Sequence, residues 1–322
     1  MSTSKPIVAI TRALPGIVEV AGADVRMGGE RAFSRAELIE FVKGATALVT
    51  WVSEKVDEAL LDAAGPQLKG VCNYAVGTDN IDRAACARRG IVVTNTPNVV
   101  TEGTADLAWM LILAVARRLI PADRFARSAD YARMGPLGPT EFTGRDLTGR
   151  TLLIVGAGRI GQAVALRSIG WGMKVLYVAR EKHWEFELAP LAAERVTLED
   201  GMRRADVVSV HTPLTAETRH IINAKNLAMM QSTAILINTA RGPVVDEQAL
   251  VDVLKAKKIW GAGLDVFERE PTVHPELVGM ENVVLTPHIG SGALKYREMM
   301  TAMALENAQA VVEGKRPPNV VG

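Results

Sequence analysis

Three residues in the C-terminal half of the sequence have side chains suited to delivering a proton and binding a small acid. Arg241 follows the apolar stretch of INTARGPVVD, Glu270 precedes a proline in GLDVFEREP, and His288 follows the apolar stretch of VLTPHIGSG. An arginine fork can bind a carboxylate or a keto oxygen. An imidazole, with an ordinary pKa of about 6.5, can give a proton at neutral pH. A glutamate bonded to the ring favours the imidazolium and fixes its orientation.

The elements that must position these residues follow an alternating pattern. Apolar, strand-like segments (IVAIT, ALVTW, GVCNY and IVVTN, then TLLIV, KVLYV, VVSVH, AILINT, GAGLDV and NVVLTP) are separated by helix-like segments. One helix-like segment, SRAELIEFVKGA, begins with Ser34 and Glu37 at capping-box spacing. Strands of this kind indicate parallel sheets built from strand–helix–strand units. Two such series predict two doubly wound α/β domains with a boundary near residue 100, followed at 128–150 by a Gly/Pro-rich irregular connection.

A dinucleotide-binding motif lies in the second series. The strand TLLIV leads into GAGRIG, which places Gly156, Gly158 and Gly161 at GxGxxG spacing before a helix-like segment. The first glycine permits a tight turn, the second lets a pyrophosphate approach the backbone, and the third lets the helix pack on the strand. Taken singly, the residues at 241, 270 and 288 fit a surface arginine, a loop acid and a capped histidine. Because strand ends gather at one edge of such a sheet, their order behind this motif favours chemistry beside the dinucleotide.

The end of the next strand indicates which nucleotide is preferred. An acid there would bind the ribose hydroxyls, and an arginine suits a 2′-phosphate. The segment VLYVAREKH places Arg180 at this point, with Glu181 and Lys182 after it and no aspartate. We therefore expect NADP(H) to be favoured, with NAD(H) possible. Whether Lys182 helps to bind the phosphate or faces solvent stays open.

Composition excludes several classes of function. The 322 residues include 37 basic and 36 acidic side chains, a net charge of +1, so no strong field attracts nucleic acid or a membrane surface. Cys72 and Cys86 lack metal-ligand spacing, and we expect reduced thiols and no metal. The start MSTSKPIVAI lacks a signal-peptide pattern, and LAWMLILAVA (107–116) is too short to span a bilayer and predicts a buried helix. These features predict a soluble cytoplasmic protein.

Along its whole length the sequence resembles the D-isomer-specific 2-hydroxyacid dehydrogenases, and within them most resembles glyoxylate/hydroxypyruvate reductases. The resemblance implies a Rossmann dinucleotide-binding domain at 100–289 and a smaller flavodoxin-like substrate-binding domain formed by 1–99 and 290–322. It also implies a homodimer formed through the nucleotide domain. The motifs that carry it are NYAVGTDNID, TNTPNVVTEGTADLA, GAGRIGQAVA, HTPLTAETRHIIN, INTARGPVVDEQAL, GAGLDVFEREP and NVVLTPHIGS.

The same resemblance implies a role for each matching residue. Arg241, Glu270 and His288 fall on the family's catalytic arginine, glutamate and histidine. The amides of Val76 and Gly77 fall on the loop that holds the substrate carboxylate. The remaining positions contact the cofactor: Asp265 at the nicotinamide carboxamide, and Thr104, Arg159, Ile160, His211, Pro213 and Thr239 elsewhere.

The sequence also departs from related reductases, which often carry a tryptophan between about 128 and 143. Here that stretch has Tyr131 and Phe142 instead. Trp51 lies where the substrate-side loop is expected and is either a pocket wall that favours small acids or a core residue.

The predicted function is NADPH-dependent reduction of glyoxylate or hydroxypyruvate to glycolate or D-glycerate. One alternative is another dehydrogenase of this family, acting on lactate-like, branched-chain or phosphoglycerate substrates. The other is a nucleotide-sensing binding protein like the family's corepressors.

Overall fold

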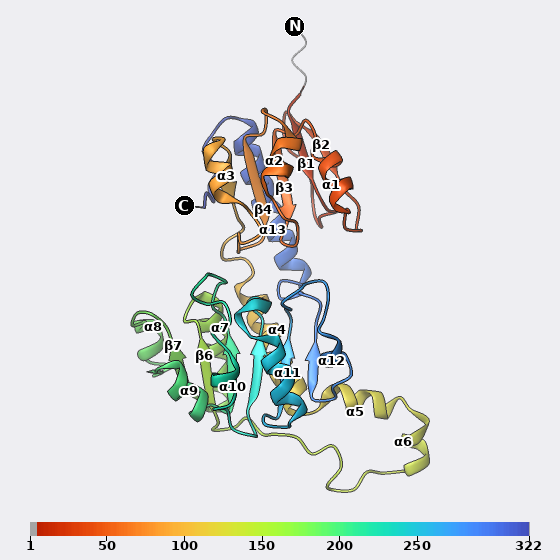
Figure 1. Cartoon of the computed structure of the whole chain (residues 1–322), viewed down its shortest axis with the longest axis vertical. Helices are drawn as coiled ribbons and strands as arrows, with labels where there is room; N and C mark the ends of the chain where they lie inside the picture. Colours follow the sequence, from red (N-terminus) through yellow and green to blue (C-terminus); the bar gives the residue numbers. More distant parts are fainter. Residues whose placement is uncertain (1–4, 322) are drawn as a thin grey trace. The chain divides into compact units, whose positions relative to one another are not determined.

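The computed structural model describes residues 5–321 and divides into two compact units. One unit comprises residues 1–100 and 291–322, and the other comprises residues 101–290. Each unit contains a parallel sheet flanked by helices (Figure 1). The expectation of two α/β domains with parallel sheets is therefore confirmed.

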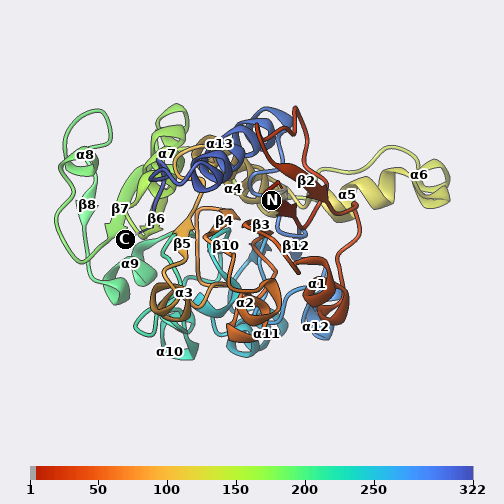
Figure 2. The same ribbon diagram turned by 90° about the horizontal axis from the view of Figure 1, so that it is seen from above.

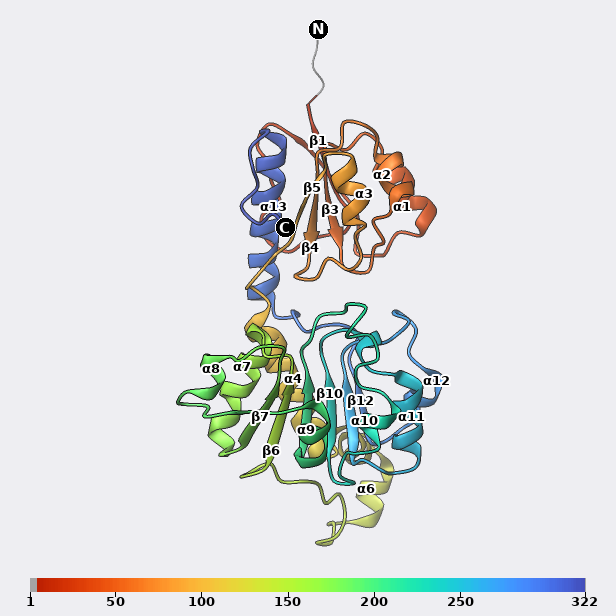
Figure 3. The same ribbon diagram turned by 60° about the vertical axis from the view of Figure 1, so that its left-hand side comes forward.

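The first unit has a five-stranded sheet with the order β2-β1-β3-β4-β5. Figures 2 and 3 show the long helix α13 on one face and α1 to α3 on the other. The predicted capping box is present, because the Ser34 hydroxyl accepts from the Glu37 amide and the Glu37 carboxylate accepts from the Ser34 amide. The elements are β1 Ile7–Ile10, β2 Asp24–Met27, α1 Arg35–Phe41, β3 Ala47–Trp51, α2 Glu58–Ala64, β4 Gly70–Tyr74, α3 Arg83–Arg88, β5 Val92–Thr94 and α13 Leu294–Val312.

The second unit has a seven-stranded sheet with the order β12-β11-β10-β9-β6-β7-β8. The chain runs outward from β6 through β7 to β8, and then returns to place β9 on the other side of β6. This reversal is a topological switch point, where ligands of open α/β sheets bind beside the strand carboxyl ends. The strands are β6 Thr151–Val155, β7 Lys174–Val178, β8 Glu194–Arg195, β9 Val207–Val210, β10 Ile235–Asn238, β11 Gly261–Leu264 and β12 Val283–Leu285.

The helices of the second unit connect and cover these strands. Part of the segment 128–150, expected to be irregular, forms the short helix α6, so that expectation is corrected. The pattern Ser-Ala-Asp there allows an extended cap followed by an acidic first turn, which suits a helix start. The helices are α4 Thr101–Ala116, α5 Leu119–Ala126, α6 Ala129–Met134, α7 Arg159–Arg167, α8 Trp184–Glu187, α9 Leu198–Arg204, α10 Ala224–Leu227, α11 Glu247–Lys255, α12 Pro275–Val278, and the 3₁₀ turns η1 Ser168–Trp171 and η2 Gly242–Val244.

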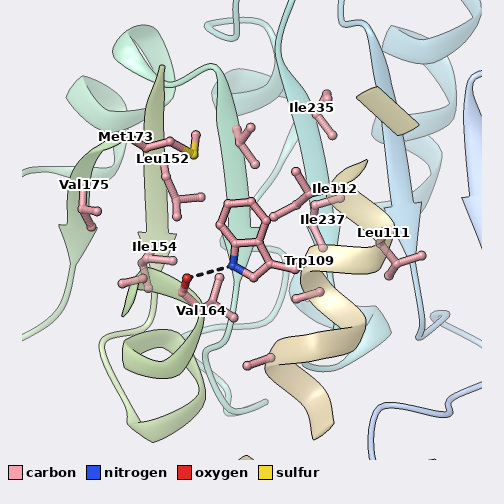
Figure 4. Packing of buried hydrophobic residues seen from close by; sticks show 14 of the residues in the cluster. Trp109, Leu111, Ile112, Leu152, Ile154, Val164, Met173, Val175, Ile235 and Ile237 are labelled. Carbon is pink, nitrogen blue, oxygen red and sulfur yellow. Dashed lines mark hydrogen bonds between the residues drawn. The ribbon is translucent and has the colours of Figure 1, made fainter. Parts of the chain in front are cut away.

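Helix α4 is buried in the core of the second unit, as the apolar run in its sequence predicts. Trp109 lies among apolar side chains of α4, β6 and β10, and its indole N–H donates to the Val164 carbonyl of α7 at 2.9 Å (Figure 4). Its ring also stacks on Trp171, with centroids 5.9 Å apart. Within residues 5–321, no helix combines the length and the hydropathy needed to cross a bilayer.

Candidate active site

His288 and Glu270 form a hydrogen-bonded pair. The Nδ1 atom of His288 lies 2.8 Å from Oε2 of Glu270, and both side chains are about seven-tenths buried. The other carboxylate oxygen of Glu270 accepts from the Phe267 amide at 3.1 Å, which fixes the carboxylate. Since a carboxylate only accepts hydrogen bonds, Nδ1 carries the proton in this pair. Nε2 is therefore the ring atom available for proton exchange with a ligand.

The loop that carries His288 is anchored by Asp265 at the end of β11. The Asp265 carboxylate accepts from the Thr286 hydroxyl at 2.7 Å and from the amides of Ile289 and Gly290 at 2.8 and 2.9 Å. The His288 amide donates to the Asp265 carbonyl at 2.8 Å. Asp265 is 1% exposed, and burial raises its pKa although its hydrogen bonds oppose the shift. The sequence assigned Asp265 to the cofactor; the structure adds that it positions the His288 loop.

Arg241 lies on a turn that packs against the segment leading to Glu270. Asn238, which is 1% exposed, accepts from the Ala240 amide at 3.0 Å and donates to the Arg241 carbonyl at 2.9 Å. A Cβ added to Gly242 would lie 1.9 Å from the Phe267 carbonyl carbon, so only glycine allows this approach. The turns after β10 and β11 are therefore held in direct contact. The roles of Asn238 and Gly242 were not predicted from the sequence, although both residues lie within INTARGPVVD.

The glycine turn after β6 leaves its outer side open. Gly156 has a φ of 104°, and a Cβ there would lie 2.7 Å from the Thr212 amide nitrogen. A Cβ on Gly161 would lie 2.3 Å from the Gly156 carbonyl oxygen, whereas one on Gly158 meets nothing within 4 Å. The N-cap of α7 at Gly158 is therefore open, and no side chain caps the helix there. This arrangement fits the pyrophosphate of a dinucleotide.

Two expected cofactor residues carry buried polar atoms without a hydrogen-bond partner in residues 5–321. These atoms are Nδ1 of His211 and Oγ1 of Thr239. The Nε2 atom of His211 lies 2.7 Å from the Ser209 hydroxyl, and burial lowers the pKa of His211 to about 3. Buried polar groups in native proteins are nearly always bonded, so these atoms fit contacts to a bound nucleotide. His211 is neutral at physiological pH and would act there through hydrogen bonding.

The other expected cofactor contacts lie on neighbouring segments of the second unit. Thr104 is 5% exposed in α4, and a Cβ on Gly290 would lie 3.2 Å from its hydroxyl. The carbonyl of Pro213 accepts from the Thr218 hydroxyl at 2.6 Å. Arg180 is exposed at the end of β7. Its positive charge contributes to the lowered pKa of Glu217, which is due first to a hydrogen bond from Thr215.

The expected substrate loop belongs to the first unit and is fixed through its carbonyl groups. Asn95 donates to the Val76 carbonyl at 2.7 Å, and the buried Asn73 donates to the Gly77 carbonyl at 2.7 Å. Within residues 5–321 the amide N–H groups of Val76 and Gly77 donate to no acceptor. Two fixed, unused donors on adjacent residues suit a carboxylate. The motif NYAVGTDN contains Asn73, but its anchoring role was not predicted.

Trp51 ends β3 and is packed on both sides by residues of the first unit. Its ring stacks on Tyr74 with centroids 5.4 Å apart, and the Arg297 guanidinium lies 4.7 Å from its centroid. Tyr74 is almost fully buried, and Trp51 is half-buried. The packing role therefore has direct support, while contact with a substrate stays a prediction.

The switch-point sheet, the open glycine turn and the histidine–glutamate pair define the class of protein as a dinucleotide-dependent α/β enzyme. The sequence model of the "D-isomer specific 2-hydroxyacid dehydrogenase, NAD binding domain" matches residues 109–290. The chain belongs to this family and is an NAD(P)-dependent oxidoreductase.

Two curated relatives and two solved structures are similar over nearly the whole chain. The glyoxylate reductases of Thermococcus onnurineus and Pyrococcus horikoshii are 48% and 47% identical, over 98% of this chain and 96% of each relative. The TT0316 protein from Thermus thermophilus has a TM-score of 0.90 at 42% identity, with 98% and 100% of the two chains covered. The NADPH-dependent glyoxylate/hydroxypyruvate reductase of Sinorhizobium meliloti, in complex with NADP and malonate, has a TM-score of 0.84 at 32% identity, with 99% and 97% covered.

The lowered pKa of His211 predicts a pH-dependent stability that a substitution removes. The folded protein binds a proton at His211 only near pH 3, whereas the unfolded chain binds it near 6.5. Stability from this group is therefore complete above pH 6.5 and falls by up to about 1.4 kcal/mol for each pH unit below it. We expect His211→Asn to lose less stability than the wild type between pH 7 and pH 5 in urea denaturation. His274→Asn, which removes another histidine, serves as control; equal losses in all three proteins would contradict the prediction.

Proposed function

We propose that this protein reduces a small 2-oxo acid, glyoxylate or hydroxypyruvate, to the 2-hydroxy acid with NADPH. The observation that carries the proposal is the His288–Glu270 pair at 2.8 Å. The segment leading to Glu270 packs on the turn of Arg241, and the three residues follow neighbouring strands. The relatives named glyoxylate reductase support the substrate class. The arginine at the end of β7, and the NADPH-dependent relative from Sinorhizobium meliloti, support the coenzyme.

The hydrogen-bond donors of these residues indicate their roles in the proposed reaction. Arg241 presents guanidinium N–H groups to an anionic oxygen of the substrate. In the first unit, the amides of Val76 and Gly77 are two further donors suited to a carboxylate. When bound, a reduced nicotinamide would supply the hydride that the keto carbon receives. The imidazolium of His288 gives its Nε2 proton to the keto oxygen and becomes the neutral ring. Glu270 keeps the Nδ1 proton in place and so directs Nε2 at the substrate.

Steady-state rates with four acids and two coenzymes test the proposed function. We expect glyoxylate and hydroxypyruvate to give a higher kcat/KM than pyruvate or phosphohydroxypyruvate, and NADPH a higher value than NADH. Highest turnover of pyruvate or phosphohydroxypyruvate would assign the protein to another branch of the family. A strong NADH preference would contradict the coenzyme assignment alone.

Substitution of the paired residues tests the mechanism. We expect His288→Asn to lower kcat by about 100- to 10,000-fold, since general acid catalysis contributes on this scale. Glu270→Gln should have a smaller effect in the same direction, because it weakens the support of the imidazolium. NADPH binding, followed by fluorescence titration, should change little in both variants. Undiminished turnover in His288→Asn with intact NADPH binding would rule out this mechanism.

We also propose that the protein is a homodimer formed through the second unit. Large apolar side chains are exposed on helices that pack on one another: Met110 on α4, Leu166 on α7 and Ile169 on η1 are 40–45% exposed. The start of α5 adds Leu119 and Ile120, at 53% and 42%. An exposed apolar surface of this kind marks a protein interface.

Charged substitutions on this surface test the dimer. We expect the wild type to have the mass of a dimer in light scattering, and Leu166→Asp/Ile169→Asp to shift toward the monomer mass because it buries carboxylates in the interface. Ile17→Asp, at an apolar residue of the first unit that is 82% exposed, is the matched control and should remain dimeric. A monomeric wild type, or a dimer unaffected by the double substitution, would contradict the proposal.

A further inference from the structure

The edge of the second sheet brings two arginines together that are distant in the sequence. Strand β8 pairs in parallel with β7, with Tyr177 opposite Arg195 in the register. From there the Arg195 side chain reaches the turn after β7. Its Nη2 donates to the Arg180 carbonyl at 2.5 Å and to the Ala179 carbonyl at 3.0 Å, and its Nε donates to Ala179 at 3.3 Å. The Arg195 guanidinium is therefore fixed at the turn that carries Arg180.

Neither arginine is neutralised by a carboxylate at ion-pair distance within residues 5–321, in contrast to the other cation of this turn. Lys182 lies 2.7 Å from the Glu187 carboxylate and 4.2 Å from the centroid of the Trp184 ring. Glu187 is itself fixed by the Tyr177 hydroxyl at 2.7 Å. The sequence left open whether Lys182 binds the 2′-phosphate or faces solvent. In the structure Lys182 pairs with Glu187 of its own loop, and Arg195 is the cation held at the turn of Arg180.

The acids near the two arginines are engaged with other groups. Arg195 contributes to the lowered pKa of Glu187, which is due first to the hydrogen bond from Lys182. Glu194, next to Arg195 in β8, pairs with Arg204, which also contacts Asp200 at 2.6 Å. Glu217 faces Arg180 but its carboxylate accepts from the Thr215 hydroxyl at 2.7 Å. Because Glu217 partly offsets the charge of Arg180, a second cation increases the attraction for an anion at this turn.

We propose that Arg195 is a second ligand of the 2′-phosphate of NADP(H), acting with Arg180. This inference rests on the proposed NADPH preference and extends it to a residue that the glycine motif and the strand-end pattern do not indicate. A phosphate monoester dianion accepts several N–H donors and offsets the repulsion between two guanidinium groups. The Nη1 of Arg195 donates to no acceptor in residues 5–321 and is available for this contact. The bonds from its Nε and Nη2 to carbonyl groups hold the side chain before the ligand arrives, which lowers the entropy lost on binding.

Paired ligands that differ only in the 2′-phosphate test the inference directly. Calorimetric titrations of the full-length wild type with adenosine 2′,5′-bisphosphate and with adenosine 5′-monophosphate isolate the contribution of that phosphate. We expect Arg195→Met to weaken binding of the bisphosphate about tenfold, the scale of a charge-assisted hydrogen bond, and to change binding of the monophosphate by less than about twofold. Arg195→Lys should recover part of the loss. Lys182→Met is the matched control at the same turn and should retain the wild-type ratio of the two affinities.

The outcomes separate this inference from the proposed coenzyme preference. If the wild type prefers the bisphosphate and Arg195→Met keeps that preference, the role of Arg195 is wrong and the NADPH assignment stands. If Arg195→Met weakens both ligands equally, Arg195 only supports the turn and the inference is wrong. If the wild type binds both ligands equally, the NADPH preference fails, and the role of Arg195 fails with it.

Discussion

The buried carboxylate of Asp265, at the end of β11, holds the loop that carries His288, the proposed general acid. Asp265 accepts from one hydroxyl and two backbone amides of residues 286–290, and its own carbonyl accepts from the His288 amide. Burying a carboxylate is unfavourable unless such bonds replace water, and here they do so from a single loop. The imidazole direction is therefore set by the anchor below the loop as well as by Glu270. Because the Asp265 carboxylate is buried, a loop conformation that breaks these bonds would leave it without partners and is disfavoured.

The parallel sheet brings the loop anchored by Asp265 to the same edge as the turns that carry Arg241 and Glu270. Strands β10, β11 and β12 are neighbours, so Arg241, Glu270 and His288 follow consecutive strand ends at one edge. Because Gly242 has no side chain, the turn after β10 can lie in direct contact with the turn after β11. Strand order and one close backbone contact therefore bring the turns that carry these residues to the same edge of the sheet.

Elements that have a strong local sequence pattern could be predicted from the sequence. The apolar strands, the buried helix α4, the Ser34 capping box and the glycine turn follow from periodicity or from spacing within a few residues. Strands β2 and β8, with the sequences DVRM and ER, carry no apolar run and were not predicted. The order of His288 and Glu270 behind the dinucleotide motif predicted that they act together. Their side chains lie 2.8 Å apart, and their catalytic role stays a prediction.

Side-chain contacts that are set by the tertiary structure could not be predicted in the same way. The support of the Val76 and Gly77 carbonyls by Asn95 and Asn73 has no periodic signal, since an asparagine in a strand-like segment has many possible partners. The engagement of Lys182 with Glu187 depends on the path of the chain through α8. Helix α6 was missed because glycines and prolines surround a segment of only six helical residues.

The return of the chain to the first unit has a consequence for the order in which the protein matures on the ribosome. Helix α13 packs on β3 and β4, whose residues precede it by more than two hundred positions. Until residues 294–312 have left the exit tunnel, those strands lack the cover on one face. Residues 101–290 are complete before that point, so the Rossmann unit can finish folding while the N-terminal strands wait. The polypeptide that is made first is thus the last to become fully packed, and one face of its sheet stays uncovered during synthesis.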